Sequence, residues 1–277
     1  MARAALTDVL AAAQQARSGL GAFNVIQLEH AEAIVAGAEA AGRPTVLQVS
    51  ENAVRYHGAL APVGRAMLEV ADAAGVPVVV HLDHATDVDL VEQALTLGFT
   101  SVMFDGSTLP VEENLATTRR VVERAHDRGA SVEAEIGEIG GKDGVHAPGV
   151  RTRPEDAARF VEETGIDAVA VAVGSSHAMT TRTARLDLDL IATIRDAVPV
   201  PLVLHGSSGV PDDHLREAVS AGMTKINIST HLNGTFTRAV RDMLAADPAL
   251  VDPRKYLGAA RTATAQEVER LVRLLAG

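Results

Sequence analysis

Residues 75–87 read GVPVVVHLDHATD, and this stretch shows the unit from which the chain is built. A nearly continuous apolar run follows a glycine and a proline. Parallel strands that are covered on both faces have this composition, because neither face meets water. The run ends at Asp83 and His84, and the next segment, Asp87–Leu97, has helical periodicity and stops at a glycine. The stretch therefore predicts a buried strand with a polar end, followed by a helix.

The same unit recurs along the 277 residues. Eight runs are predicted to be strands: Ala22–Ile26, Thr45–Ser50, Pro77–His81 continuing to His84, Ser101–Asp105, Ser131–Ile136, Ala168–Val173, Pro201–His205 and Lys225–Thr230. Predicted helices with clear end signals are Leu28–Ala41, Val63–Ala74, Asp87–Leu97, Pro154–Thr164 and Asp212–Ala221. Alternating strands and helices predict an α/β fold, a closed (β/α)8 TIM barrel. We expect one domain over residues 1–277, with an extra N-terminal helix and a helical tail from about Thr262.

A doubly wound open sheet is the alternative fold. It would need a glycine-rich dinucleotide-binding turn after an early strand, and the sequence has no such turn. The formal net charge of −11 argues against binding to nucleic acid or to an anionic membrane. The absence of cysteine excludes disulfides, thiolate zinc sites and a cysteine nucleophile. With no apolar run of about 18 residues and no cleavable signal pattern, we expect a cytoplasmic protein.

Polar residues gather where the predicted strands end. In a TIM barrel these carboxyl ends form the catalytic face. The residues, in strand order, are Asn24, Ser50 and Glu51, Asp83 and His84, Asp105, Glu133 with Glu135 and Glu138, His177, His205 to Ser208, and Asn227 with Ser229 and Thr230. The opposite ends of the strands carry no comparable cluster. The asymmetry predicts an active site at the mouth of the barrel.

Three histidines, His84, His177 and His205, follow the third, sixth and seventh predicted strands. Any one of them alone is better explained as a hydrogen-bonded residue at the start of a loop. Three neutral imidazoles that converge on one barrel mouth suit zinc, and three protein ligands leave a coordination position for substrate. The set therefore predicts a catalytic zinc site.

Two glycine-containing segments also follow strands. His205-Gly-Ser-Ser-Gly209 precedes a helix, and Asn227 to Thr230 ends the eighth strand with hydroxyl groups. Loops seven and eight of such barrels commonly form a phosphate site, although Gly-Ser-Ser-Gly is also an ordinary turn sequence. Residues 135–144 lead from the fifth strand into a glycine-rich loop, which is either a plain connector or a mobile loop that carries a base.

Seven motifs extend over nearly the whole chain in a fixed order. They are AFNV at 22–25, QVSENAVRYHG at 48–58, HLDHATD at 81–87, EAEIGEIGGKDG at 133–144, HGSSG at 205–209, KINIST at 225–230 and DPRKYL at 252–257. Together they resemble the class II, metal-dependent fructose-bisphosphate/tagatose-bisphosphate aldolases. HLDHATD is the most specific of the seven.

The resemblance implies the metal ligands. His84, His177 and His205 would hold the catalytic zinc ion, Zn2+, and Asp105 with Glu135 match positions where the family's zinc rests further inside. A monovalent cation, Na+ or K+, near the phosphate is also common in the family.

The resemblance also implies the reaction, in which a ketose 1,6-bisphosphate is cleaved reversibly to dihydroxyacetone phosphate and an aldehyde. Asp83 would exchange a proton with the C4 hydroxyl. Asp143 stands where the family usually has a glutamate, the base for the C1 proton, and is one methylene shorter. Zinc would stabilise the enediolate as charge develops.

The substrate contacts follow from the same resemblance. Asn24 and Ser50 would contact substrate, and Arg254 of a neighbouring subunit would reach the second phosphate, which implies a homodimer or homotetramer. The phosphate of dihydroxyacetone phosphate would be held by Gly206, Ser207, Ser208, Asn227, Ile228, Ser229 and Thr230, beside Ala178, where the family usually has glycine. Further departures at 151–154, Ser229 and His231 leave open whether the substrate is fructose, tagatose or another phosphorylated ketose.

Two other functions compete with this interpretation. A Schiff-base aldolase needs a desolvated lysine, but Lys225 is predicted at the wrong end of its strand, Lys142 in a loop and Lys255 in the tail. A non-catalytic barrel that binds a sugar phosphate and supports a partner subunit would have no need of an acid such as Asp83 beside a metal.

Overall fold

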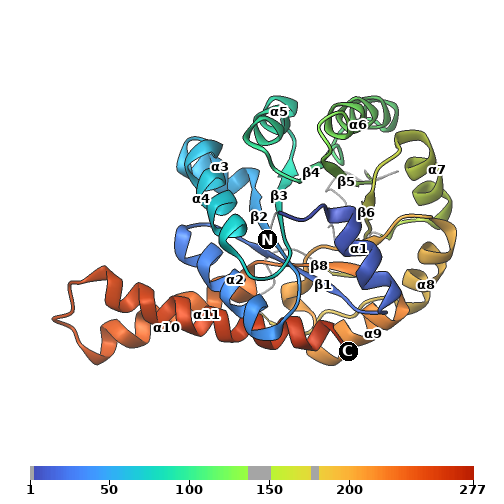
Figure 1. Ribbon diagram of the computed structural model, residues 1–277. Coiled ribbons are helices and arrows are strands. Elements are labelled where there is room, and N and C mark those ends of the chain that lie inside the picture. The colour runs from blue at the N-terminus through green and yellow to red at the C-terminus, as the bar shows by residue number, and fades with distance from the viewer. Residues whose placement is uncertain (1–2, 137–150, 176–180) are drawn as a thin grey trace.

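The computed structural model describes residues 3–136, 151–175 and 181–277. Within these residues, eight parallel strands form one closed barrel, in which each strand pairs with the next along the chain and β8 pairs with β1 (Figure 1). The strands are β1 (Leu20–Asn24), β2 (Thr45–Ser50), β3 (Val78–Ala85), β4 (Ser101–Phe104), β5 (Ser131–Glu135), β6 (Ala168–Ala170), β7 (Leu202–Leu204) and β8 (Met223–Ile228). The predicted (β/α)8 fold is confirmed, and the open doubly wound sheet is excluded.

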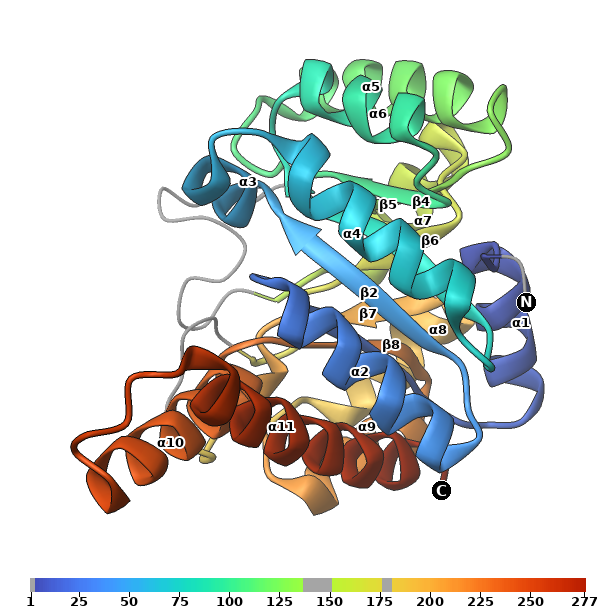
Figure 2. The ribbon, with the colours of Figure 1, turned by 60° about the vertical axis from the view of Figure 1, so that its left-hand side comes forward.

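Helices cover the outside of the barrel, and Figure 2 shows α2 and α4 on either side of β2. The helices that follow the strands are α2 (Leu28–Ala41), α3 (Glu51–His57), α4 (Leu60–Ala73), α5 (Val88–Leu97), α6 (Val111–His126), α7 (Pro154–Thr164), α8 (Leu188–Ala197) and α9 (Asp212–Ala221). The bounds of α2, α7 and α9 are those predicted. A glycine in the left-handed region ends α2 and α7, which is the signal used to predict them.

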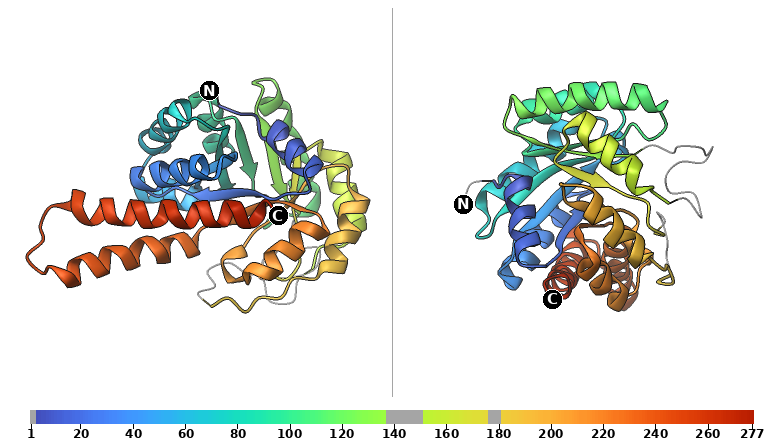
Figure 3. Two further views of the ribbon diagram at one scale, coloured as in Figure 1. Left: turned by 60° about the horizontal axis from the view of Figure 1, so that its bottom comes forward. Right: turned by 90° about the vertical axis from the view of Figure 1, so that its right-hand side faces the viewer.

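The C-terminal part of the chain forms a helical arm. α10 (Thr230–Ala246) and α11 (Pro253–Leu275) run antiparallel and project beyond the barrel (Figures 1 and 3). The tail helix therefore starts well before the predicted Thr262, because Asp252 caps it and Pro253 occupies its first turn. The inner part of α11 lies against α2 so closely that a Cβ on Gly37 would come within 2.5 Å of the Ala265 carbonyl oxygen.

The amino-terminal half of the barrel interior is apolar. The predicted extra N-terminal helix is α1 (Leu6–Gln15), and its Leu6 and Leu10 pack with Val46 and Val79 in one buried cluster. The helix thus fills the end of the barrel that is opposite to the predicted site. We call this cluster the barrel floor; it also contains Val9, Ala13, Leu20, Ala22, Ala168, Ala170 and Val203.

The carboxyl half of the same interior is polar. Side chains two residues apart on a strand share a face, so Val79, His81 and Asp83 of β3 follow one another up the inside of the barrel. Along β2, Val46 is likewise followed by Gln48, which is fully buried. The inward-facing row therefore changes from apolar to polar halfway along the strands.

The position of Lys225 on its strand differs from the one predicted from the sequence. The eighth strand spans Met223–Ile228 rather than Lys225–Thr230, because Thr230 already begins α10. Lys225 is thus in the middle of β8 and is fully buried, not at the strand's wrong end. No helix of the described residues is long and apolar enough to cross a membrane.

Candidate active site and metal centre

A cavity of about 610 Å³ opens at the carboxyl ends of the strands. Nine of the residues that line it were predicted as site residues: Asn24, Ser50, Asp83, His84, Gly206, Ser208, Asn227, Ser229 and Thr230. Gln48 and Asn52 also line it and were missed. Gln48 could have been found, because it lies two residues before Ser50 and so shares its face of β2. The structure thus brings the ends of β1, β2, β3 and β8 and the loop after β7 around one space.

Asp83 is held by three carboxamides. Asn24 Nδ2 and Gln48 Nε2 donate to Asp83 Oδ2 at 3.2 and 3.3 Å, and Asn227 Nδ2 donates to Asp83 Oδ1 at 3.3 Å. Gln48 Nε2 also donates to Asn24 Oδ1 at 2.8 Å, which fixes the first two amides relative to each other. The carboxylate is 3% exposed, so its remaining access to solvent is through the cavity. This arrangement holds the Asp83 side chain in one orientation.

His84 has an unusual backbone conformation. Among the described residues, it and Arg17 are the non-glycine residues with positive φ, and its φ is 50°. The pairing of β3 with β4 shifts register between Leu82 and Ala85, around this residue. Irregularities of this kind reorient a side chain and occur beside active sites. Here the bulge directs both Asp83 and His84 to the cavity, although successive strand residues normally face opposite sides.

Three carboxylates surround the His84 imidazole. Its Nδ1 lies 2.8 Å from Asp105 Oδ2 and 3.9 Å from Glu135 Oε2. Burial alone would lower the pKa of His84, but the charges of Asp83, Glu135 and Asp105 and the hydrogen bond to Asp105 raise it to about 10. The same hydrogen bond and charge outweigh burial at Asp105 and lower the pKa of that carboxyl. The carboxylates around the His84 imidazole therefore favour a positive charge there.

His205 lies beside His84, with the ring centroids 4.6 Å apart and the planes at 71°. His205 Nε2 is 2.9 Å from Glu133 Oε1, and His205 Nδ1 is 3.6 Å from Glu135 Oε2. The ring is 1% exposed. One edge of the imidazole therefore faces the barrel interior, and the other edge faces the group around His84.

Two overlapping sets of side chains have the composition of a metal site. The ligand atoms of Asp83, His84 and His205 lie within 4.8 Å of one another, and so do those of His84, Asp105 and Glu135. Imidazole nitrogen and carboxylate oxygen are the donors that zinc takes in catalytic sites, and an anionic donor set suits a divalent cation. The residues present therefore fit the predicted metal. His177, the third predicted histidine, lies outside the described residues.

The loop after β7 and the start of α10 form one wall of the cavity. Gly206 has a φ of 65°, which allows the chain to turn sharply into Ser207 and Ser208. Ser208 Oγ accepts from the His231 amide at 3.2 Å and ties this loop to α10. Ser229 and Thr230 bring the amino-terminal end of α10 to the cavity, where the helix dipole favours an anion. These properties suit a phosphate group, and we call the wall that contains Gly206, Ser208, Ser229 and Thr230 the phosphate wall.

Several predicted residues do not line the cavity. Ser207 donates its hydroxyl hydrogen to the Asn227 carbonyl oxygen at 2.5 Å and is buried, as is Ile228. These two residues therefore build the wall without presenting their side chains to it. Arg254 lies in the first turn of α11, at the outer end of the arm, where its guanidinium pairs with Asp252 at 2.8 Å. The predicted residues Asp143 and Ala178 lie outside the described residues.

Ion pairs tie the phosphate wall to the outer helices. His231 Nε2 of α10 lies 2.6 Å from Glu267 Oε1 of α11, and Arg270 donates to Glu267 at 2.7 Å and to Asp212 of α9 at 2.6 Å. Burial alone would raise the pKa of Glu267, but the hydrogen bonds from His231 and Arg270 and the charge of Arg270 lower it to about 2. We call these four residues the rim cluster.

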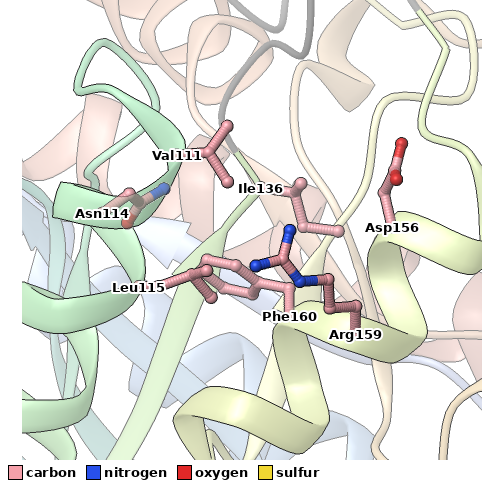
Figure 4. Close-up of a pocket in the computed structure, with 7 residues that line it drawn as sticks. All are labelled: Val111, Asn114, Leu115, Ile136, Asp156, Arg159 and Phe160. Atoms are coloured by element: carbon pink, nitrogen blue, oxygen red, sulfur yellow. The ribbon is translucent and has the colours of Figure 1, made fainter.

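A second hollow, between α6 and α7, is chemically different. Its lining, drawn in Figure 4, combines the apolar side chains of Val111, Leu115, Ile136 and Phe160 with the polar side chains of Asn114, Asp156 and Arg159. Arg159 is engaged by Glu163 and Glu112 at 2.6 and 3.0 Å. Among its described lining residues, this hollow has no cluster of acids, imidazoles and amides like that of the mouth.

Comparisons with known proteins agree with the geometry. The family model described as "Fructose-bisphosphate aldolase class-II" matches residues 4–277. The fructose-bisphosphate aldolase of Geobacillus stearothermophilus is 41% identical over 267 residues, which is 95% of this chain and 93% of the relative. That of Staphylococcus aureus strain Mu50 is 38% identical over 268 residues, 95% and 94% of the two chains. The crystal structure of the YdjI aldolase from Escherichia coli K12 superimposes with a TM-score of 0.84 at 30% identity, covering 98% of this chain and 96% of that one.

Proposed function

The chain belongs to the class-II fructose-bisphosphate aldolase family, and on that premise we propose that residues 1–277 act as one domain whose barrel mouth cleaves a ketose 1,6-bisphosphate to dihydroxyacetone phosphate and an aldehyde. The enzyme is a class II ketose-bisphosphate aldolase, a lyase. The observation that carries the placement of the site is the convergence of Asp83, His84 and His205, with ligand atoms within 4.8 Å of one another.

His84 and His205 are the ligands of the catalytic zinc in this proposal, together with His177. Asp105 and Glu135, which face His84 from the side of β4 and β5, offer the inner position. When bound, zinc supplies a Lewis acid that stabilises the negative charge developing on the carbonyl oxygen of the substrate. A monovalent cation, Na+ or K+, beside the phosphate belongs to the same proposal.

Asp83 is the acid/base for the C4 hydroxyl. In cleavage its carboxylate accepts the hydroxyl proton while the C3–C4 bond breaks, C4 becomes the aldehyde carbon, and the electron pair of the bond moves toward the C2 carbonyl. Three amide donors orient the Asp83 carboxylate, which also lines the cavity, and this fixed placement is what an acid/base requires. Asp143 then delivers a proton to the former C3 and completes dihydroxyacetone phosphate. In condensation both protons travel in the opposite direction.

The phosphate of dihydroxyacetone phosphate lies against the wall that contains Gly206, Ser208, Ser229 and Thr230. Backbone amides of the turn after β7 and the amino-terminal end of α10 supply the positive potential there, although the chain has a net charge of −11. Asn24 and Ser50 contact the carbon chain from the opposite side. Their position at the ends of β1 and β2 supports this role.

The arm supports an assembly of at least two copies. Arg254 lies at the outer end of the arm, so it serves the second phosphate of a neighbouring copy, in a homodimer or homotetramer. Its side chain is 89% exposed, so the guanidinium can exchange Asp252 for a phosphate. A cytoplasmic location with a small sugar phosphate as the partner is consistent with the acidic composition.

A Schiff-base mechanism is disfavoured by the surroundings of the two lysines that the structure describes, whereas Lys142 lies outside the described residues. Lys225 Nζ lies 2.7 Å from Glu133 Oε2 in the closed interior, so it is an ion-paired cation rather than an amine nucleophile. Lys255 is exposed on the arm. A non-catalytic barrel is disfavoured by Asp83, whose three amide donors orient a carboxylate that a pure binder does not need.

Metal removal tests the mechanism. We expect dialysis against a chelator to abolish cleavage of ketose 1,6-bisphosphates, and added zinc to restore it. Borohydride with substrate should leave no covalent adduct. The test should use fructose and tagatose 1,6-bisphosphates and a ketose 1-phosphate, because the substrates differ in one stereocentre or one phosphate. Full activity without metal, or trapping on a lysine, would contradict the proposal.

A further inference from the structure

Lys225 occupies a position that the reaction does not explain. Its ammonium is fully buried inside the barrel, between the barrel floor and the mouth. A buried charge is costly unless it is paired and hydrogen-bonded. Lys225 Nζ donates to Glu133 Oε2 at 2.7 Å and to Asn227 Oδ1 at 2.9 Å. It therefore connects β8 to β5 across the interior.

Each partner of Lys225 contacts one side of the active site. The second oxygen of Glu133, Oε1, lies 2.9 Å from Nε2 of His205, a proposed metal ligand. The amide nitrogen of Asn227 donates to Oδ1 of Asp83, the proposed acid/base, at 3.3 Å. One ammonium is thus two hydrogen bonds away from both groups.

The lysine determines which atoms donate and which accept in these hydrogen bonds. An ammonium group has three donors and no acceptor, so both groups that it contacts must present oxygen. Asn227 must therefore turn its Oδ1 to Lys225, which leaves Nδ2 for Asp83. Glu133 pairs with Lys225 through Oε2 and accepts through Oε1, so the nearby nitrogen of His205 must carry a hydrogen. The neutral imidazole then has its lone pair on Nδ1, the nitrogen on the side of Glu135 and His84.

We infer that Lys225 is a positioning residue that sets the tautomer of His205 through Glu133 and the orientation of the Asn227 amide through its side-chain oxygen. The inference rests on the proposed function, because it concerns the same metal ligand and the same acid/base. A direct hydrogen-bonding partner on the second ring nitrogen is known to fix a metal-binding histidine. Here the buried Lys225 ammonium fixes that partner, which is Glu133.

His81 does not take over this role. Its Nδ1 lies 2.8 Å from Ser101 Oγ and its Nε2 is 3.9 Å from Glu133 Oε2. Burial, and then the nearby Lys225 ammonium, hold the pKa of His81 well below its usual value. His81 is thus neutral, and Lys225 supplies the positive charge that faces Glu133.

Replacing Glu133 by glutamine gives the sharpest test. A glutamine side chain has a single oxygen, which Lys225 will hold, so its NH2 group faces His205 Nε2. That nitrogen must then accept, and the hydrogen moves to Nδ1. In the metal-free protein, nitrogen-15 NMR of the imidazole rings should show the Nε2–H tautomer of His205 in the parent and the Nδ1–H tautomer in Glu133→Gln. Zinc affinity, measured by competition with a chromophoric chelator, should fall by about 10- to 100-fold.

The double variant Lys225→Met/Glu133→Gln isolates the lysine. It has no buried charge at either position, so it avoids an unpaired carboxylate that could prevent folding. Without Lys225 the oxygen of the introduced glutamine is able to turn to His205, and we expect the Nε2–H tautomer and part of the zinc affinity to return. At saturating zinc, kcat should stay below that of the parent, because Asn227 has lost the donor that orients its amide toward Asp83.

Lys255→Met is the matched control for removal of a lysine, because Lys255 is exposed on the arm. Its His205 tautomer and zinc affinity should equal those of the parent. The inference is overturned if Glu133→Gln retains the Nε2–H tautomer, or if the double variant recovers neither the tautomer nor the affinity. Parent-like kcat in the double variant would overturn the Asn227 branch. If the parent binds no zinc, the proposed function fails, whereas the tautomer measurement on metal-free protein still decides the inference.

Discussion

The two halves of the barrel interior are built on the same strands and differ in what holds them together. In the barrel floor, Leu6 and Leu10 of α1 pack against Val46 and Val79. Each fully buried leucine or valine side chain there contributes about 1.5–3 kcal/mol, and none of them needs a hydrogen-bonding partner. Further along the same strands, the inward-facing row carries hydrogen-bonding groups. A buried donor or acceptor that loses its partner costs about 1–3 kcal/mol, so orientation matters there.

This contrast separates folding from chemistry. The floor can exchange one aliphatic residue for another of similar volume at modest cost. At the mouth, the Lys225 ammonium, the Asn227 amide and the Asp83 carboxylate depend on one another in sequence, so a change in one alters the next. We therefore expect substitutions at the mouth to affect activity more than stability, and substitutions in the floor to do the reverse.

Asp83→Asn is expected to have the largest effect. The amide occupies the same volume but cannot accept the C4 proton, so kcat should fall about 10²- to 10⁴-fold, the usual contribution of a general acid/base. Steady-state cleavage kinetics and zinc content by metal analysis check this, and zinc content should remain at the parent level. Asp127→Asn, at an exposed position after α6, is the control and should retain parent kinetics. Normal turnover in Asp83→Asn would remove the assigned role.

Leu10→Ala tests the floor. Leu10 is 0% exposed, and its truncation leaves a space under α1, so the free energy of unfolding should fall by about 2–5 kcal/mol. Urea unfolding measures the loss, and kcat at 25 °C should remain close to that of the parent. Leu28→Ala, at a side chain that is 47% exposed, should lower stability far less. A fall in kcat without a loss of stability in Leu10→Ala would show that the two halves are coupled more tightly than their contacts indicate.

The floor and the mouth also differ in how well the sequence predicted them. The apolar run Thr45–Ser50 gave the bounds of β2 correctly, because both faces of a buried parallel strand are covered. The other runs located their strands but not the bounds; β1, for example, spans Leu20–Asn24 rather than Ala22–Ile26. Polar residues at strand ends gave Asp83, His84 and His205. The sequence did not predict the φ of 50° at His84, because closure of the barrel and the register shift between β3 and β4 impose it.

Lys225 and the arm show where the pattern was insufficient. A lone lysine within KINIST gives no sign of an acidic partner on β5, since the pairing with Glu133 depends on contacts across the barrel. Gln48 was missed although its position two residues before Ser50 contained the information. The start of α11 at Pro253 was missed because helical periodicity before Thr262 is weak where the arm projects into solvent, and the capping residues Asp252 and Pro253 were the available signal.

Substitution in the rim cluster gives the smallest expected effect on stability. It also distinguishes the mouth from the floor, because the stability that the rim cluster contributes depends on pH. The pKa of Glu267 is lowered from 4.5 to about 2 by His231 of α10 and Arg270 of α11, with Asp212 of α9 on the far side of Arg270. A lowered carboxyl pKa adds stability above pH 4.5 that is lost as the pH falls toward 2. Glu267→Gln should therefore be slightly less stable than the parent at pH 7 and lose less stability on acidification, as urea unfolding at low salt from pH 7 to about 3 will show.

The loss of stability of Glu267→Gln at pH 7 should be well below that of Leu10→Ala, because Glu267 is partly exposed to solvent. Glu123→Gln, on the exposed face of α6, should keep the parent slope, and so should Leu10→Ala, since the floor contains no titratable group within its cluster of described residues. An unchanged acid slope in Glu267→Gln would mean that the loops of the phosphate wall are held to α11 without this carboxylate.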